Sequence, residues 1–178
     1  MGGREMYIKL IGSLFLLGSA SAIGYLKAEE LNLRVKRLLE LKRMIVFLQG
    51  ELRFHKVSLS EAFEHVSVRM EGPFDVFLKE LSEKLEKKDQ RPLMELWQEA
   101  VDKLLKSEGL QKEDKHLLEL LGKGLGYLDL RMQTENLQMA LMQTEEAVIA
   151  AKEVQKVKGR LYQTMGMSAG VFLVLLIV

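Results

Sequence analysis

The stretch LGKGLGYLDLRMQTENLQ, residues 121–138, decides between two kinds of fold. Gly122, Gly124 and Gly126 stand within five residues, and Lys123 lies between the first two. Glycine-rich loops that carry a lysine bind phosphates in nucleotide-binding α/β folds. Glycines at the end of a helix instead let the backbone turn toward another helix. The residues around this stretch distinguish the two.

The surrounding letters do not fit a phosphate loop. A Walker loop follows a strand and has Ser or Thr after its lysine, but here a leucine-rich segment precedes and Gly124 follows Lys123. The dinucleotide pattern requires a glycine where Tyr127 stands. We therefore predict a junction between two helices, with glycines in left-handed backbone and Asp129 as N-cap or first-turn acid of the next helix. No cofactor is expected.

The composition favours an all-α fold. The chain has 178 residues, only two prolines, and many Leu, Glu, Lys, Met and Gln residues, which form helices readily. A formal net charge of +1 gives no general attraction to nucleic acid. The absence of cysteine excludes disulfides, thiolate metal sites and thiol nucleophiles.

Apolar residues recur every three or four positions through most of the chain, as on one face of a helix. Ser58 and Glu61 have the spacing of a capping box, and Pro73 after Gly72 suits a first helical position. The predicted helices cover about 28–52, 59–70, 73–85, 93–104, 117–121 and 130 to the C-terminus. The expected architecture is a compact bundle of about six helices with a transmembrane helix at each end.

Two apolar runs predict the membrane segments. Residues 10–26 and 161–178 contain no charged side chain, and about 20 helical residues cross a bilayer core. We expect a short tail at 1–6, a transmembrane helix at 7–27, a cytoplasmic bundle at 28–160 and a transmembrane helix at 161–178. Small residues spaced four apart suit close helix packing in lipid. The pairs are Gly18 with Ala22, Ala20 with Gly24, and Gly166 with Gly170.

Basic residues predict the orientation. Lys and Arg gather after the first run and before the second, which by the positive-inside rule places both termini outside and the bundle in the cytoplasm. An alternative remains open, because Arg4, Lys9, the apolar run and Ala20-Ser21-Ala22 also look like a secretory signal. Cleavage after Ala22 would then release a secreted or surface helical protein.

No pattern of catalytic or metal-binding residues appears. The three histidines form no HExxH motif, and Glu51 with His55 reads as a local helix contact. No serine lies in a GxSxG elbow. We expect neither an enzyme nor a metal site. A partner surface is expected instead on the last helix, at Arg131, Glu145 and Glu146. Met132, Met139 and Met142 fit a packing surface, with an adaptable partner face as the alternative.

The junction carries a family resemblance over essentially the whole chain. Its residues match the pattern LGxxLGxxDxxxQ, and YQTMGMSAGVFLVLLIV at 162–178 is also similar. The matching junction positions are Leu121, Gly122, Leu125, Gly126, Asp129 and Gln133. The chain resembles stage III sporulation protein AB of endospore-forming bacteria. It departs from the family pattern at Phe54, where a tyrosine is usual, and at Ser58, where a proline is usual.

The resemblance implies a membrane protein of the mother cell. Such a protein would join the complex that connects mother cell and forespore, with its helical domain similar to that of the type II secretion F protein. The implied partners are a cytoplasmic secretion-type ATPase, other subunits of the complex and the lipid bilayer, and the protein itself would not catalyse. Small residues in both apolar runs also make a homo-oligomer plausible.

Overall fold

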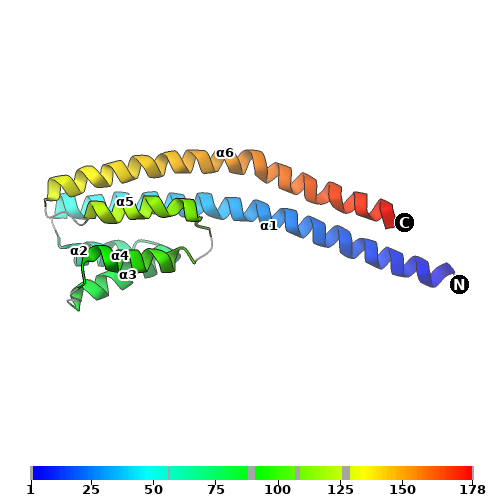
Figure 1. Ribbon diagram of the computed structural model, residues 1–178, viewed down its shortest axis with the longest axis horizontal. Coiled ribbons are helices and arrows are strands. Elements are labelled where there is room, and N and C mark those ends of the chain that lie inside the picture. Colours follow the sequence, from blue (N-terminus) through cyan, green and yellow to red (C-terminus); the bar gives the residue numbers. More distant parts are fainter. Residues whose placement is uncertain (1, 56, 88–90, 107–108, 126–128, 178) are drawn as a thin grey trace. The chain divides into compact units, whose positions relative to one another are not determined.

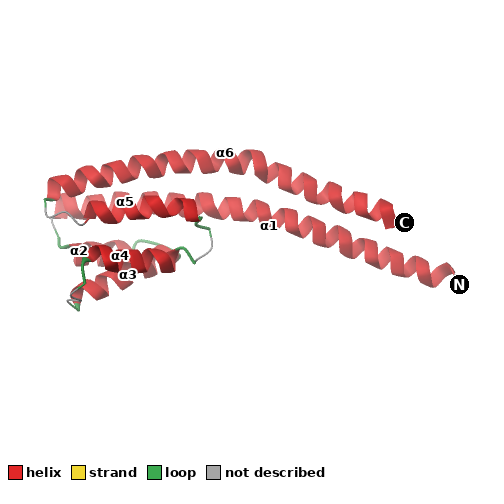
Figure 2. Ribbon diagram, viewed as in Figure 1, coloured by secondary structure: helices red, strands yellow, loops and turns green. Residues whose placement is uncertain are grey.

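The protein is helical in every described segment. The computed structural model describes residues 2–55, 57–87, 91–106, 109–125 and 129–177, and some side chains near both ends lie outside this description. Six α-helices and two short helical turns make up this part of the chain, with no strand (Figure 2). The α-helices are α1 Gly2–Gly50, α2 Leu59–Ser67, α3 Pro73–Glu86, α4 Leu93–Leu104, α5 Lys115–Leu125 and α6 Leu130–Ile177. The prediction of an all-α chain with six helices is confirmed.

The chain divides into two compact units. One unit contains Arg34–Ala150, and the other contains Met1–Leu33 together with Ala151–Val178. The first unit, here called the bundle, holds α2 to α5 and the inner parts of α1 and α6 (Figure 1). The second unit holds the outer parts of the two long helices.

The helices of the bundle pack around a core of buried apolar side chains. The inward face of α1 contributes Leu38, Leu41, Ile45 and Leu48, all with no exposed area. Burial of such side chains stabilises a fold by roughly 1.5–3 kcal/mol each. Other fully buried large side chains are Met44, Phe63, Phe74, Leu78, Leu81, Leu96, Trp97 and Leu117. All of these except Met44 lie on an apolar row that the sequence predicts.

Two helix starts follow the predicted signals. Ser58 caps α2, since the Glu61 backbone N–H donates to Ser58 Oγ at 3.3 Å and the Ser58 N–H donates to the Glu61 carboxylate at 3.0 Å. Gly72 has a φ of 68°, which favours glycine, and Pro73 begins α3. The capping box and the proline start are both confirmed.

The outer parts of α1 and α6 lie side by side in the second unit, where Gln155 Nε2 donates to Asn32 Oδ1 at 2.8 Å. Within the described part of the chain, no helical stretch is long and apolar enough to cross a bilayer. The predicted transmembrane helices at 7–27 and 161–178 therefore gain no support from these residues. Many side chains in both runs, including positions 166 and 170, lie outside the description.

Among the small residues predicted to pack membrane helices, Gly18 and Ala22 are exposed and Gly24 is buried. A Cβ added at Gly18 would meet nothing within 4 Å. The packing role of these positions stays a prediction.

Candidate functional site

The predicted junction lies between α5 and α6, but its glycines act differently from the expectation. Gly122 and Gly124 lie inside α5, whose last residue is Leu125. Positive φ values among the described glycines occur at Gly72 and Gly109 instead. The expectation of left-handed backbone at Gly122 is therefore wrong. Gly126 lies outside the described residues.

Gly122 is needed for close packing against Trp97 of α4. A Cβ built at Gly122 would lie 2.5 Å from Trp97 Nε1 and 2.7 Å from Cγ, which no real Cβ tolerates. The absent side chain leaves room for Trp97 Nε1 to donate a hydrogen bond to the Leu118 carbonyl at 2.8 Å. The indole thus lies directly on the α5 backbone, one turn before Gly122.

Trp97 in turn joins four helices. It has no exposed area. Its ring lies 5.0 Å from Phe77 of α3 in an edge-to-face arrangement and 6.0 Å from Phe63 of α2. Such pairs add about 0.5–1.5 kcal/mol beyond area burial. The motif glycine therefore completes the contact that ties α5 to α2, α3 and α4.

The other motif residues fix the start of α6. Asp129 Oδ1 accepts from the Arg131 backbone N–H at 2.9 Å, as an N-cap does. Gln133 Nε2 donates to the Leu125 carbonyl at 3.1 Å, which satisfies a free carbonyl at the end of α5. Leu121 is fully buried. These contacts hold the end of one helix against the start of the next.

Gly124 makes a second close approach, this time to α6. A Cβ at Gly124 would lie 2.8 Å from Asn136 Cβ. The backbones of α5 and α6 therefore run close together just beyond the junction. Two glycines of the segment whose sequence resembles a phosphate loop therefore allow close helix contacts. Gly122 lies against α4, and Gly124 lies against α6.

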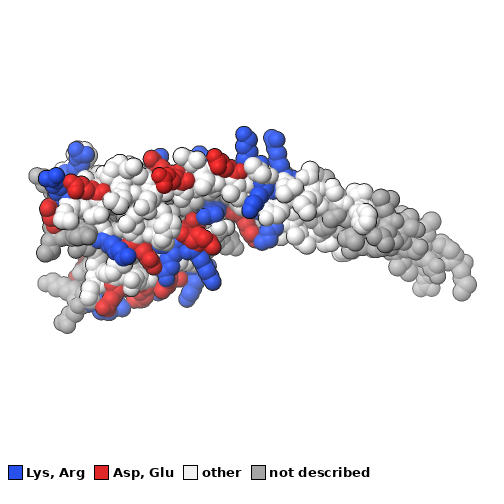
Figure 3. Space-filling model, turned by 45° about the horizontal axis from the view of Figure 1, so that its top comes forward, with Lys and Arg blue, Asp and Glu red and all other residues white. Residues whose placement is uncertain are grey.

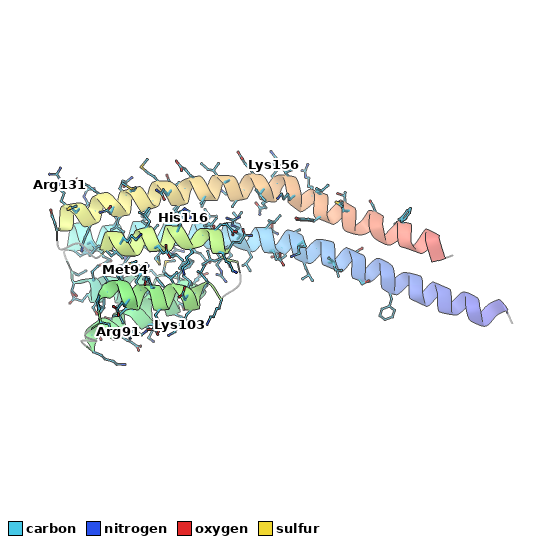
Figure 4. All side chains as sticks on the ribbon, viewed as in Figure 1. Arg91, Met94, Lys103, His116, Arg131 and Lys156 are labelled. Carbon is cyan, nitrogen blue, oxygen red and sulfur yellow. The ribbon has the colours of Figure 1, made fainter. Side chains whose placement is uncertain are left out.

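The three residues of the predicted partner surface lie on α6 but in different environments. Arg131 is exposed and pairs with Glu135 at 2.9 Å (Figure 4). Glu145 pairs with Lys42 of α1 at 2.9 Å, so it contributes to packing within the bundle. Glu146 is exposed and forms no ion pair with any described residue. Acidic and basic groups are interspersed over the bundle surface in Figure 3.

A buried carboxylate is the feature that the sequence analysis missed. Glu51 begins a π-helical turn, Glu51–His55, and is 2% exposed. Its carboxylate accepts from Nδ1 of His65 at 3.0 Å and of His55 at 3.1 Å, and pairs with Arg69 at 3.2 Å. The hydrogen bond from His65 is the largest influence that lowers the pKa of Glu51, and it outweighs the opposing effect of burial.

The spacing of Glu51 and His55 indicates only their own contact. His65 and Arg69 reach Glu51 because α2 packs back against the π-helical turn, and sequence spacing does not reveal that contact. The described residues contain no group of three or more His, Cys, Asp or Glu side chains arranged for a metal ion.

A second charged cluster links α3 and α4. Glu99 receives hydrogen bonds from Lys84, Lys103 and Arg91, which lower its pKa to about 2. Lys103 (Figure 4) also pairs with Glu80, and both border a surface cleft of about 300 Å³. The remainder of the cleft is lined by Pro73, Val76, Phe77, Ala100 and Leu104. These five side chains are apolar.

These features define a class of protein: an all-helical domain whose described motif residues hold helices together. The family model for stage III sporulation protein AB matches residues 9–178, and the chain belongs to this family. It is 22% identical over 170 residues to stage III sporulation protein AB of Bacillus subtilis strain 168, covering 96% of this chain and 99% of the relative. A solved structure of stage III sporulation protein AB matches with a TM-score of 0.62 and 20% identity over 68% of this chain and 94% of its own.

Proposed function

We propose that this protein is a non-catalytic, membrane-anchored platform subunit of the sporulation complex that links mother cell and forespore. The observation that carries the proposal is the family match, which extends from residue 9 to residue 178 and so includes nearly all of both apolar runs. The described contacts of the motif residues favour a structural role, because each of them stabilises a helix or a helix pair.

In this proposal both apolar runs anchor the chain in the mother-cell membrane that faces the forespore. The bundle lies in the mother-cell cytoplasm, which agrees with the basic residues next to both runs. Its partners are a cytoplasmic secretion-type ATPase and other subunits of the stage III complex. The protein would transmit the action of the ATPase to the membrane assembly and is needed for late forespore development.

The proposal is tested in sporulating cells of the organism that encodes the protein. Membranes are washed with salt and alkaline carbonate, and an affinity-tagged full-length chain is then purified in detergent. We expect the chain to stay in the washed membranes and to co-purify with the ATPase. Deletion of the gene should arrest forespore development after engulfment, and the full-length gene should restore it. Normal spores from the deletion strain would refute the proposal.

A second candidate function follows from the signal-like N-terminus. If the chain is cleaved after Ala22, the mature protein begins at Ile23 and is secreted or held at the surface. N-terminal sequencing of the protein from sporulating cells distinguishes the two candidates. An intact N-terminus supports the anchored platform, and Ile23 as first residue supports release.

A further inference from the structure

The outward face of α6 carries an apolar row that the bundle does not use. Met132, Met139, Met142 and Ile149 are 44%, 51%, 56% and 60% exposed. Their spacing of seven, three and seven residues is that of a coiled-coil seam. The buried residues of α6, such as Leu137 and Ala140, lie on the opposite side of the helix. Unbranched methionines in such a row adapt to the shape of a partner helix.

This row carries two carboxylates and one guanidinium. Glu135 and Glu146 lie between the apolar residues, and Arg131 lies at the edge of the same helical face. Glu135 is paired with Arg131 at 2.9 Å. Glu146 forms no ion pair within the part of the chain that the structure describes. We call this surface the α6 row.

The outward face of α1 within the bundle is complementary. Leu39 and Val46 are seven residues apart and 40% and 43% exposed. Lys36 and Arg43 lie on the same face, also seven residues apart, and both are exposed. Neither forms an ion pair with a described residue, although Arg43 lies 5.2 Å from the centre of its neighbour, the Phe47 ring. We call this basic and apolar surface the α1 row.

The two rows do not meet within one molecule. Inside the bundle, α1 and α6 contact each other through different residues, Lys42 with Glu145 at 2.9 Å and Gln49 with Gln138 at 3.1 Å. Both rows are left exposed by this packing. One chain therefore presents two exposed helical faces, one with a net negative charge and one basic, each with apolar residues at seven-residue spacing.

We propose that the α1 row of one copy packs against the α6 row of a second copy, with the two helices antiparallel. Placing Lys36 beside Glu146 brings Leu39 to the level of Gln143, one residue from Met142, and brings Arg43 to the level of Met139, four residues from Glu135. The charge pairs fix the register, and the apolar residues supply the buried area. This inference goes beyond the proposed function, since it concerns contact between copies and is testable in purified protein.

The first test uses charge reversal in the full-length chain, purified in detergent. Association is measured by sedimentation over a range of concentrations. Glu146→Lys and Lys36→Glu are each expected to weaken association about five- to tenfold, as reversing one partly exposed charge pair does. The double variant, with both charges exchanged, should recover most of the loss. Glu64→Lys, at an exposed position on α2, is the control and should leave association unchanged.

The second test uses the absence of cysteine from the natural chain, which makes every crosslink assignable. Full-length Leu39→Cys and Met142→Cys chains, carrying different tags, are mixed and treated with a short bis-maleimide. We expect crosslinks between the two kinds of chain and few within either kind alone. Val68→Cys, exposed on another part of the bundle, is the control partner and should not crosslink to Met142→Cys.

Three outcomes would overturn the proposal. Met142→Cys chains that crosslink only to one another would show α6 pairing with α6. A chain that stays monomeric at every concentration would show that these rows do not bind a second copy. Failure of the double variant to recover association would show that Lys36 and Glu146 do not meet. Each variant is compared with the unmodified chain by circular dichroism, so that loss of folding is recognised separately.

Discussion

Gly122 has only a hydrogen atom where other residues have a side chain, and this lets Trp97 pack directly on the α5 backbone. The indole of Trp97 occupies the space that a Cβ would fill, and its N–H reaches the Leu118 carbonyl. A buried indole N–H without a partner would destabilise the fold, so the hydrogen bond and the glycine depend on each other. This contact explains the first glycine of the motif without any ligand.

We predict that Gly122→Ala destabilises the bundle by about 1–3 kcal/mol, because overpacking would push the Trp97 ring off the α5 backbone. Urea unfolding followed by Trp97 fluorescence measures the change. Gly159→Ala is the matched control, since a Cβ there meets nothing within 4 Å and alanine favours helix. It should leave stability equal or slightly higher. Equal stability of Gly122→Ala and the natural chain would refute the packing role.

The lowered pKa of Glu51 predicts how the stability of the fold depends on pH. The folded state prefers the ionised carboxylate that accepts from His65 and His55 and pairs with Arg69. This contribution to stability is complete above the ordinary pKa of 4.5 and is lost as the pH falls toward the lowered value. Glu51→Gln should remove this part of the acid dependence and lower stability at neutral pH.

The measurement is urea unfolding at several pH values between about 5.5 and 3. The natural chain should lose stability more steeply over this range than Glu51→Gln. Glu64→Gln, at an exposed position on α2, is the control and should follow the natural chain. Parallel pH profiles for the natural chain and Glu51→Gln would contradict the assignment.

For a single residue, the sequence predicts a local role, such as a helix cap, more easily than it predicts a contact with a residue far along the chain. The spacing of Ser58 and Glu61 predicts the cap of α2, because both partners lie within one helical turn. The contacts of Gly122 with Trp97 and of Glu51 with His65 join segments 25 and 14 residues apart. No local rule gives the direction in which such segments pack, so the glycine is assigned to a helix end and the carboxylate cluster is missed.

Helices are the scale at which the sequence is most informative. The apolar rows of α1 through α6 repeat every three or four residues, and the starts of α2, α3, α4 and α6 carry a cap or a proline. The number and type of these elements therefore follow from the sequence. The π-helical turn at Glu51–His55 does not follow, because a wider turn leaves the periodicity of its neighbours nearly intact. Its position depends on the contact with α2.

An ion pair between Arg34 and Asp114 joins α1 to the turn before α5. Arg34 donates to both carboxylate oxygens of Asp114, at 2.8 and 3.2 Å, and Asp114 is 2% exposed. Asp114 also accepts from the Gln111 backbone N–H at 2.9 Å. We predict that Asp114→Asn lowers the free energy of unfolding by about 1–3 kcal/mol, because it leaves a half-buried guanidinium without its anion.

The control for this prediction is Asp102→Asn. Asp102 pairs with Lys115 at 2.8 Å, but its side chain is 61% exposed, and such pairs contribute about 0–1 kcal/mol. In urea unfolding, Asp114→Asn should therefore lose more stability than Asp102→Asn, because the first breaks a buried ion pair and the second an exposed one. Equal losses for Asp102→Asn and Asp114→Asn would show that burial does not set the strength of the Arg34 contact.

For the whole molecule, the question is on which side of a membrane the bundle lies. The anchored platform places it in the cytoplasm, and the secreted alternative places it outside. Because the natural chain has no cysteine, a single Lys112→Cys substitution gives one exposed thiol for labelling. A membrane-impermeant maleimide added to intact mother cells should not label this thiol, and labelling should appear after permeabilisation. The positive-inside rule is the physical reason, since basic residues adjoin both apolar runs on the bundle side. Labelling in intact cells would place the bundle outside and favour release of the chain after Ala22.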